Sequence, residues 1–358
     1  MEKLDYIIVG LGIAGVTFCE QLEAAGKSFI VIDAEESNAT SVAGGVVNPV
    51  VLKRITPVWK AGEFMDVALP FYKKLSSKLN ANFFSETAIQ RIFYSAKEQN
   101  DWMIACDSKA LSPFLSAEIS KNENEAVKAP FGLGSVKQCF QINTGELLTR
   151  YRTHLKDSDR LVVSEFDYAE IEKFEDHFQY KNHSAKHLVF SEGSRIIQNP
   201  HFSIEAIIPK KGEYIIFESE ELQLKTILKG SYFIIPLGEN KYKAGATFAH
   251  GDTSLNITDK GRDQLIEGVR KMIQCDMNVV DQVSGMRPTV KDRRPILGSL
   301  LSDSMYFFNG LGTRGLLMAP LLSNWLFRHI EEGLELPSEV NIRRFQLKCY
   351  LVSTFSRS

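Results

Sequence analysis

Apolar and polar residues follow one another along the N-terminal part of the chain in blocks that predict two strands and a helix. Residues 6–9 form a short apolar run rich in β-branched side chains, as expected of a buried parallel strand, and residues 28–32 form another. Between them, residues 13–25 place apolar side chains at helical spacing, and Gly26 follows where a helix would end. We therefore expect a strand–helix–strand unit here.

Later apolar runs divide into two kinds. Two short runs that end near glycine or polar residues, 161–163 and 188–193, predict strands that return to the first sheet. Three others are separated by polar turns, as in an antiparallel sheet, and cover 214–217, 232–236 and 242–247. The pattern predicts an α/β chain in which a parallel or mixed sheet is interrupted by a mainly antiparallel one.

Glycines occupy the turn between the first strand and the helix. Gly10, Gly12 and Gly15 form a GxGxxG pattern, and Asp33 ends the second strand 18 residues after Gly15. In a dinucleotide-binding turn the first glycine allows the tight bend, the second lets the backbone approach a pyrophosphate, and the third lets the helix pack against the strand. An acid at the end of the second strand accepts hydrogen bonds from a ribose. The first 33 residues therefore predict a Rossmann-like site.

A second glycine turn lies near the C-terminal end and helps to identify the dinucleotide cofactor. Gly310, Gly312 and Gly315 follow a strand-like run and precede an apolar, helix-like segment. Only 43 residues follow Gly315, too few for a second nucleotide domain. The start of a helix favours negative charge, which a reduced flavin carries on its ring. A chain with one helix for a pyrophosphate and one for a flavin ring needs an extended cofactor, and we expect FAD.

Composition and charge further limit the partners, the metal or disulfide content and the cellular location that we expect for this protein. The formal net charge of −2 gives no overall attraction to nucleic acid or anionic lipid. The five cysteines are far apart and form no CxxC pair, so we expect neither a disulfide framework nor a metal site. A strand that begins by residue 5 leaves no room for a signal peptide, and no apolar run is long enough to span a membrane. We expect a cytoplasmic protein without membrane contact.

Several short motifs resemble those of FAD-dependent glycine and D-amino-acid oxidases. Besides the two glycine turns, they cover 40–45, 210–213, 233–236, 245–247 and 285–288, in the same order as in that family. The resemblance extends over nearly the whole chain and is weakest between 95 and 185. Residues 45–49 and 312–320 are most similar to the FAD domain of the bifunctional bacterial enzyme that trims carboxymethylaminomethyl-uridine in tRNA.

The resemblance implies roles for individual residues. Arg287 matches the arginine that binds the substrate carboxylate, and Arg314 matches a second arginine near substrate and flavin. Ile171 matches an apolar residue whose backbone lies near the adenine. With the glycine turns, the expected cofactor-binding residues are Gly10, Gly12, Ile13, Ala14, Gly15, Asp33, Ala34, Thr40, Ser41, Gly44, Gly45, Val46, Val47, Ile171, Gly193, Gly312, Thr313, Arg314, Gly315, Leu316 and Leu317.

Two positions of the antiparallel region need comment. Phe233 stands where glycine oxidases have a tyrosine, and strand alternation directs the adjacent Tyr232 to the opposite face. This removes a hydroxyl expected in the pocket of an enzyme for glycine or small D-amino acids. Lys243 falls where sarcosine oxidases place a lysine near the flavin, but we interpret it as a solvent-exposed strand lysine.

The fold expected is an FAD-binding domain of residues 1–80, 140–200 and 285–358, interrupted by a substrate-binding domain of 81–139 and 201–284. The expected function is oxidation of an amino acid or secondary amine that has a free carboxylate, by hydride transfer to FAD.

Three alternatives stay open: a flavin-dependent 2-hydroxy-acid dehydrogenase, a tRNA-modifying enzyme, which the near-neutral charge disfavours, and a non-catalytic FAD-binding protein. The sequence leaves open the exact substrate, the electron acceptor, the oligomeric state and any covalent attachment of FAD.

Overall fold

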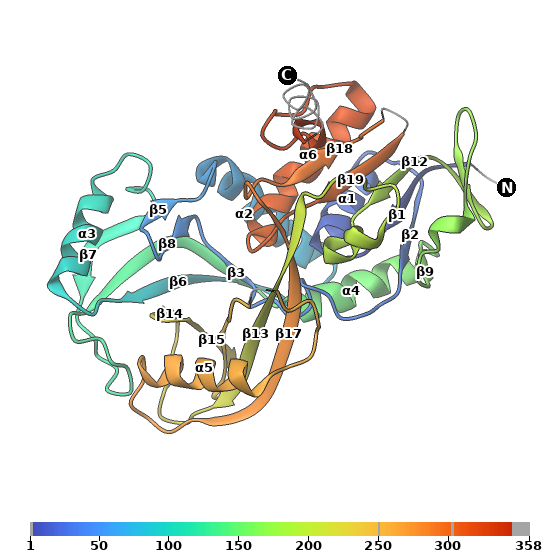
Figure 1. Cartoon of the computed structure of the whole chain (residues 1–358). Coiled ribbons are helices and arrows are strands. Elements are labelled where there is room, and N and C mark those ends of the chain that lie inside the picture. Colours follow the sequence, from blue (N-terminus) through green and yellow to red (C-terminus); the bar gives the residue numbers. More distant parts are fainter. Residues whose placement is uncertain (1–2, 250, 302–303, 346–358) are drawn as a thin grey trace, which may run out of the picture. The chain divides into compact units, whose positions relative to one another are not determined.

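The chain forms two compact units in a computed structural model that describes residues 3–249, 251–301 and 304–345. The first unit consists of Met1–Ser41, Gly145–Lys210 and Met286–Ser358, and the second of Val42–Thr144 and Lys211–Gly285. Figure 1 shows how often the chain leaves one unit and returns. Among the described residues, no helix is long and apolar enough to cross a membrane.

The first unit is built on a mixed sheet with the order β10-β11-β12-β1-β2-β9, to which β19 adds beside β12 and β18 beside β19. Its strands are β1 (Lys3–Val9), β2 (Phe29–Asp33), β9 (Leu161–Val163), β10 (Ile171–Lys173), β11 (Phe178–Tyr180), β12 (His183–Phe190), β18 (Ile296–Gly298) and β19 (Met305–Asn309). Three parallel pairings, of β1 with β2, of β1 with β12 and of β12 with β19, form its centre. The predicted return of the chain to the first sheet is confirmed.

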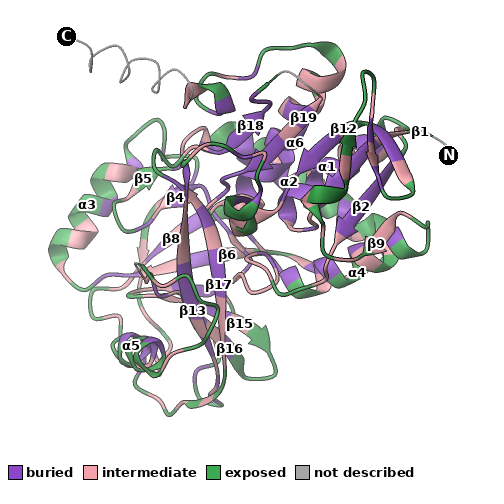
Figure 2. Ribbon diagram, turned by 45° about the vertical axis from the view of Figure 1, so that its right-hand side comes forward, coloured by how far each residue is buried: buried purple, intermediate pink, exposed green. Residues whose placement is uncertain are grey.

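The central strands read as continuous apolar runs because both faces of the sheet are covered. Residues 6–9 of β1 are nearly inaccessible to solvent, and β2 and the last three residues of β12 are buried in the same way except at Asp33 (Figure 2). Helix α1 (Ile13–Ala24) ends before Gly26, whose φ of +65° is the left-handed conformation expected after a helix. Helix α6 (Gly315–Glu332) packs against α1, and α4 (Thr144–Lys156) precedes β9.

The second unit contains a mainly antiparallel sheet with the order β17-β13-β16-β15-β14-β6-β8-β3, with β7 beside β8. Its strands are β3 (Val46–Val47), β6 (Phe84–Ile92), β7 (Leu115–Ser120), β8 (Leu133–Ile142), β13 (Ile207–Glu218), β14 (Ile227–Lys229), β15 (Phe233–Gly238), β16 (Lys241–Gly245) and β17 (Asn278–Val290). Strands β4 (Val50–Val51) and β5 (Thr56–Pro57) form a separate hairpin. The helices are α2 (Ala61–Lys78), α3 (Ala96–Cys106) and α5 (Asp259–Arg270).

The observed division differs from the expected one mainly in residues 42–80. We expected them in the FAD-binding domain, whereas they lie in the second unit. The reason is that β3 pairs with β8, and α2 packs against β6, with Tyr72 of the helix beside Phe140 of β8. Of the five cysteines counted in the sequence, Cys349 lies outside the described residues.

Candidate cofactor and substrate site

Two glycines of the N-terminal turn are required by the fold itself. Gly10 has a φ of +93°, and a Cβ there would lie 2.7 Å from the carbonyl oxygen of Ser191. A Cβ on Gly15 would lie 2.2 Å from the carbonyl oxygen of Gly10. Helix α1 therefore approaches the end of β1 as closely as the backbone allows, which is the packing that the sequence predicted for Gly15.

Gly12 is different, because no contact with the described residues requires a glycine there. Its backbone is extended, with φ −83° and ψ −167°, a conformation open to any residue. A Cβ at Gly12 would meet only the hydroxyl oxygen of Thr40, at 3.4 Å. The space beside this residue is therefore available to a molecule that comes close to the backbone.

The start of α1 has the properties of an anion site. Gly12 caps the helix without a side-chain hydrogen bond, and the first turn contains no acidic residue. The N–H of Ile13 donates to the hydroxyl of Thr40 at 3.0 Å. The first N–H groups of a helix lack intrahelical acceptors and carry its positive end, so a phosphate is stabilised at this position.

Asp33 holds the glycine turn in place from the end of β2. One carboxylate oxygen accepts a hydrogen bond from the N–H of Leu11 at 2.7 Å. The other accepts from the N–H of Glu35 at 2.9 Å and from Arg152 of α4 at 3.4 Å. The carboxylate is thus oriented by protein donors, and Arg152 is a nearby cation that the sequence did not single out.

The C-terminal glycine turn lies in the same unit, and its helix begins beside α1. Gly310 and Gly312 have φ values of +73° and +55°, which explains why glycine stands at both. A Cβ on Gly315, the first residue of α6, would lie 3.1 Å from the side chain of Ile13. The two glycine turns, about 300 positions apart in the sequence, therefore start two adjacent helices.

The two arginines expected at the substrate lie on or next to this second turn. Arg314 caps α6, and its side chain makes no capping hydrogen bond. Arg287 is half-buried on β17, and its neighbour Pro288 accepts a hydrogen bond from the N–H of Gly312 at 3.1 Å. The strand that carries Arg287 is therefore fixed directly to the turn expected at the flavin ring.

The other expected residues of the first unit lie on these same segments. Ile13 and Ala14 are in the first turn of α1, Ala34 follows β2, Thr40 and Ser41 lie in the next turn, Thr313, Leu316 and Leu317 flank the start of α6, and Gly193 begins a short 3₁₀ helix after β12.

Gly44, Gly45, Val46 and Val47 belong to the second unit, where the protein itself explains the two glycines. Gly45 has a φ of +71°, and a Cβ there would lie 1.8 Å from the carbonyl oxygen of Ile142. A Cβ on Gly44 would lie 2.6 Å from the side chain of Ile235. Neighbouring strands are therefore sufficient to explain both glycines, and their approach to a flat ring stays a prediction.

The structure does not bring Ile171 to the glycine turns. Ile171 pairs with Tyr180, which pairs with His183 at the start of β12. The glycine turn follows the other end of the sheet, where Val9 pairs with Phe190. Seven residues of strand separate the two levels, about 23 Å. The segment next to Asp33 is instead the end of β9, where the N–H of Ser164 donates to the carbonyl of Asp33 at 3.2 Å.

Polar residues at the end of β12 were missed. Ser191 is buried, and its hydroxyl has no hydrogen-bond partner among the described residues although its carbonyl borders Gly10. The carboxylate of Glu192 accepts hydrogen bonds from Tyr168 and from Asn199, and burial raises the pKa of this carboxyl. The available signal was the Ser–Glu–Gly sequence at the end of a buried strand, because polar groups at such ends face the ligand in α/β sheets.

Lys243 is not the solvent-exposed lysine that we expected. Its ammonium donates to the carbonyls of Val42 at 2.8 Å and Ala43 at 3.2 Å and lies 5.0 Å from the ring of Tyr214. Burial lowers the pKa of Lys243 to about 8. The lysine therefore fixes the residues just before Gly44. Tyr232 packs against α5, with its hydroxyl on Gln264, and so faces away from the side of Phe233 as predicted.

The residues of the first unit fit FAD. The open space at Gly12, the two helix starts and the buried hydroxyl of Ser191 provide close backbone approach, positive helix ends and an unused hydrogen-bonding group. Residues 5–328 match the family described as FAD-dependent oxidoreductase, named DAO. The chain belongs to this family. It is an FAD-dependent oxidoreductase with FAD as its cofactor.

Curated relatives at low identity are tRNA-modifying proteins. One, from Marinobacter nauticus, is named tRNA 5-methylaminomethyl-2-thiouridine biosynthesis bifunctional protein MnmC and is 18% identical over 348 residues, 89% of this chain and 54% of that protein. The protein of the same name from Nitrosospira multiformis is 25% identical over 150 residues, 38% of this chain and 24% of that protein. The chain therefore spans about half the length, or less, of these relatives.

Solved structures of the same fold include enzymes named for amino or imino acids. L-Proline dehydrogenase from P. horikoshii has a TM-score of 0.78 at 16% identity and covers 97% of this chain and 99% of its own. Glycine oxidase from Bacillus cereus has a TM-score of 0.75 at 16% identity, with 93% and 96% covered. Iminodiacetate oxidase from Chelativorans sp. has a TM-score of 0.74 at 17% identity, with 95% and 98% covered.

Proposed function

We propose that this protein oxidises an amino acid or secondary amine that carries a free carboxylate, and that Arg287 binds this carboxylate. The observation that carries the proposal is the hydrogen bond from Gly312 to Pro288, which ties the strand of Arg287 to the glycine turn at the start of α6. A carboxylate anchor beside a helix start suited to the flavin ring is what oxidation at the α-carbon of an amino acid requires.

The chain's own groups would work by positioning and electrostatics. When bound, FAD would supply the hydride acceptor for oxidation of the substrate carbon. The start of α1 would hold the pyrophosphate, and the start of α6 would stabilise negative charge on the ring. Neither helix start has an acidic residue in its first turn to oppose an anion.

Arg287 would act as an anchor and not as a base. A guanidinium offers two parallel N–H donors, which fix both the distance and the orientation of a carboxylate. Arg314, at the cap of α6, would be a second cation near the substrate. Oxidation of the amine would give an imine, which water hydrolyses to a keto or aldehyde acid and an amine or ammonia.

The names of the structural relatives support the substrate class, since glycine, L-proline and iminodiacetate all contain an amine and a carboxylate. A 2-hydroxy acid is the alternative substrate, because the same anchor serves an alcohol. The two differ in product: only the amine substrate releases ammonia or an amine. Modification of tRNA rests on relatives of which this chain covers about half, and we keep it as the third possibility.

The proposal is tested by anaerobic reduction of the purified yellow protein. Amino acids, N-substituted glycines and 2-hydroxy acids are added in turn, and loss of the 450 nm absorbance is followed. Arg287→Ala should leave FAD bound and weaken carboxylate substrates by about 2 kcal/mol, roughly 30-fold in kcat/KM, because a charged hydrogen-bond partner is lost.

Arg150→Ala is the matched control. Arg150 is exposed on α4. Among the described residues, its side chain pairs only with the carboxylate of Glu146, one helical turn away, at 2.7 Å. This variant should keep the parent kcat/KM. Equal rates for Arg287→Ala and the parent, or reduction by 2-hydroxy acids without reduction by any amine, would reject the proposed substrate class.

A further inference from the structure

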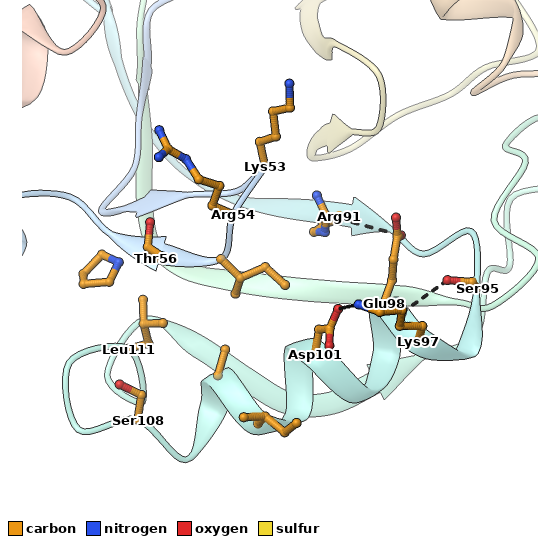
Figure 3. Close-up of a pocket in the computed structure, with 14 residues that line it drawn as sticks. Lys53, Arg54, Thr56, Arg91, Ser95, Lys97, Glu98, Asp101, Ser108 and Leu111 are labelled. Atoms are coloured by element: carbon orange, nitrogen blue, oxygen red, sulfur yellow. Dashed lines mark hydrogen bonds and ion pairs between the residues drawn. The ribbon is translucent and has the colours of Figure 1, made fainter.

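A hollow in the second unit carries an unbalanced cluster of positive charge. It has a volume of about 700 Å³ and lies between the β4–β5 hairpin, the end of β6 and helix α3 (Figure 3). The charged residues that line it are Lys53, Arg54, Arg91, Lys97, Glu98 and Asp101. Four are cations and two are anions, in a chain whose formal net charge is −2. The local excess is therefore not a property of the whole molecule.

Each of the two carboxylates in the hollow is already paired with a cation. Asp101 pairs with Lys97 at 2.7 Å, and Glu98 lies 3.8 Å from the guanidinium of Arg91. In Figure 3 both pairs carry dashed lines, whereas none reaches Lys53 or Arg54. Neither of these two side chains has an ion pair or hydrogen bond to any residue that the structure describes. They are exposed at the turn of the hairpin and supply the excess charge.

Arg91 is held at the hollow by a built contact. One of its terminal nitrogens donates to the carbonyl of Leu52 at 2.8 Å, which fixes the arginine beneath the hairpin. Only 12% of its side chain is exposed, and its Nε is buried without a hydrogen-bond partner among the described residues. A buried guanidinium nitrogen without an acceptor is costly unless a ligand supplies one.

The ammonium group of Lys229 adds to the electrostatic repulsion among the cations near the hollow. Lys229 of β14 pairs directly with Arg91 of β6, so two like charges stand opposite each other on neighbouring strands. Burial lowers the pKa of Lys229 to about 8, and the nearby charges of Arg91 and Lys53 contribute to this lowering. An anion bound at this place would relieve the repulsion among the three cations.

The uncharged lining of the hollow is partly polar and partly apolar. The apolar residues include Ile55 and Pro57 of the hairpin and Ile104 of α3, and Ile104 is 71% exposed, unusual for an isoleucine. A ligand that suits both surfaces has a multiply charged anionic group for the cations and a flat, weakly polar body for the isoleucines. A nucleotide has both, and its phosphate is the anion that a guanidinium with nearby ammonium groups binds best.

We propose that this hollow is a nucleotide-binding site, in which Lys53, Arg54 and Arg91 bind the phosphate and the base lies against Ile55 and Ile104. The proposal is independent of the carboxylate-amine oxidation proposed above. The nucleotide can be a free phosphate ester or one unit of an RNA strand, and the recognition chemistry is the same for both.

The test is a titration of the full-length, FAD-loaded protein by calorimetry. Loading with FAD keeps the cofactor site from contributing to the signal. The probes are 5′-UMP, uridine as its phosphate-free match, and pentauridylate as a short single strand. We expect binding of 5′-UMP or pentauridylate and none of uridine. Binding of 5′-UMP indicates a free phosphate ester, and binding of pentauridylate alone indicates a nucleotide within a strand.

Substitutions test whether the measured binding takes place in the hollow. Lys53→Ala/Arg54→Ala should weaken binding at least tenfold, whereas Lys74→Ala/Arg262→Ala, which removes the same two charges from exposed positions of the same unit, should change it less than twofold. Ile104→Glu, which puts a carboxylate into the hollow, should also abolish binding, and Met103→Glu, one residue away on α3, should not.

Two results would overturn the proposal. One is the absence of binding by both 5′-UMP and pentauridylate. The other is an equal loss in the two charge-removing double variants, which would mean general attraction to positive charge. All the substituted side chains are exposed, so folding is checked simply by an unchanged flavin spectrum and thermal midpoint. Arg91 is left intact because it also holds the hairpin.

Discussion

Gly12 and Gly45 look alike in the sequence, since each belongs to a glycine-containing stretch expected at FAD, but they have different roles in the two units. At Gly45 the backbone is left-handed, and a Cβ would lie only 1.8 Å from the carbonyl oxygen of Ile142, so every other residue is excluded. At Gly12 the backbone is ordinary, and a Cβ would meet only Thr40 at 3.4 Å. Contacts within the fold therefore explain Gly45, whereas the glycine at position 12 is better explained by a bound ligand.

The other glycines of these motifs can be classified in the same way, by what a Cβ at each position would contact. Gly15 belongs with Gly45, because both let one backbone touch another. Gly193 resembles Gly12 in having open space around it, although its φ of +58° gives it a conformational reason as well. A glycine motif is therefore a mixture of residues that shape the protein and residues that make room for its cofactor.

The largest effect is expected from Gly45→Ala. The substitution forces a methyl group against the backbone of β8 in a left-handed conformation, and we expect a loss of more than about 3 kcal/mol in the free energy of unfolding. Urea unfolding of the apoprotein measures it. Gly62→Ala is the control: Gly62 lies in α2 with open space around it, and alanine should add up to about 1 kcal/mol there.

Gly12→Ala should separate binding from folding. We expect the free energy of unfolding of the apoprotein to change by less than about 1 kcal/mol, because the added methyl group has room. The dissociation constant for FAD should rise at least tenfold, about 1.4 kcal/mol, because the methyl group occupies the space of the ligand. Quenching of flavin fluorescence on titration measures it. Normal FAD affinity in this variant would place the cofactor away from Gly12.

Lys243→Met should have an effect on stability that depends on pH. The pKa of Lys243 falls from 10.5 to about 8 on folding, so the unfolded chain binds more protons between these values. The free energy of unfolding of the parent should therefore rise with pH from 8 to 10, by up to about 1 kcal/mol per pH unit relative to the variant. Thermal midpoints of both proteins at pH 7.5, 8.5 and 9.5 provide the measurement. A constant difference would show that Lys243 is not desolvated.

The sequence predicted the parts of the fold whose signal is local. The apolar runs of β1 and β2, the glycines between them and the return of β9 and β12 to the same sheet are all present. Helices α2 and α3 were not recognised. Helix α2 contains Pro70, a residue that disfavours a helix interior, although its buried residues recur at helical spacing. Helix α3 buries only Trp102 and Cys106 and so shows no continuous apolar face.

Features that depend on distant contacts could not be read from the sequence. Ile171 was misplaced in the region where the family resemblance is weakest, because pairing with Tyr180 puts it at the far end of the sheet. The setting of Lys243 depends on carbonyls 200 and 201 positions away. The hollow at Arg91 requires a hairpin, a strand and a helix to meet, and only the folded chain shows that Lys229 stands opposite that arginine.

The assembly of the first unit from three stretches of chain has a consequence for synthesis on the ribosome. Helix α1 emerges early, but α6, which packs against it, and β19, which extends the sheet beyond β12, emerge only after the second unit has been made. A nascent chain thus contains the turn that we propose for the pyrophosphate long before it contains the turn that we propose for the flavin ring. On this proposal, tight binding of the vitamin-derived coenzyme must await the synthesis of α6, and the second unit can begin to fold while the first is still incomplete.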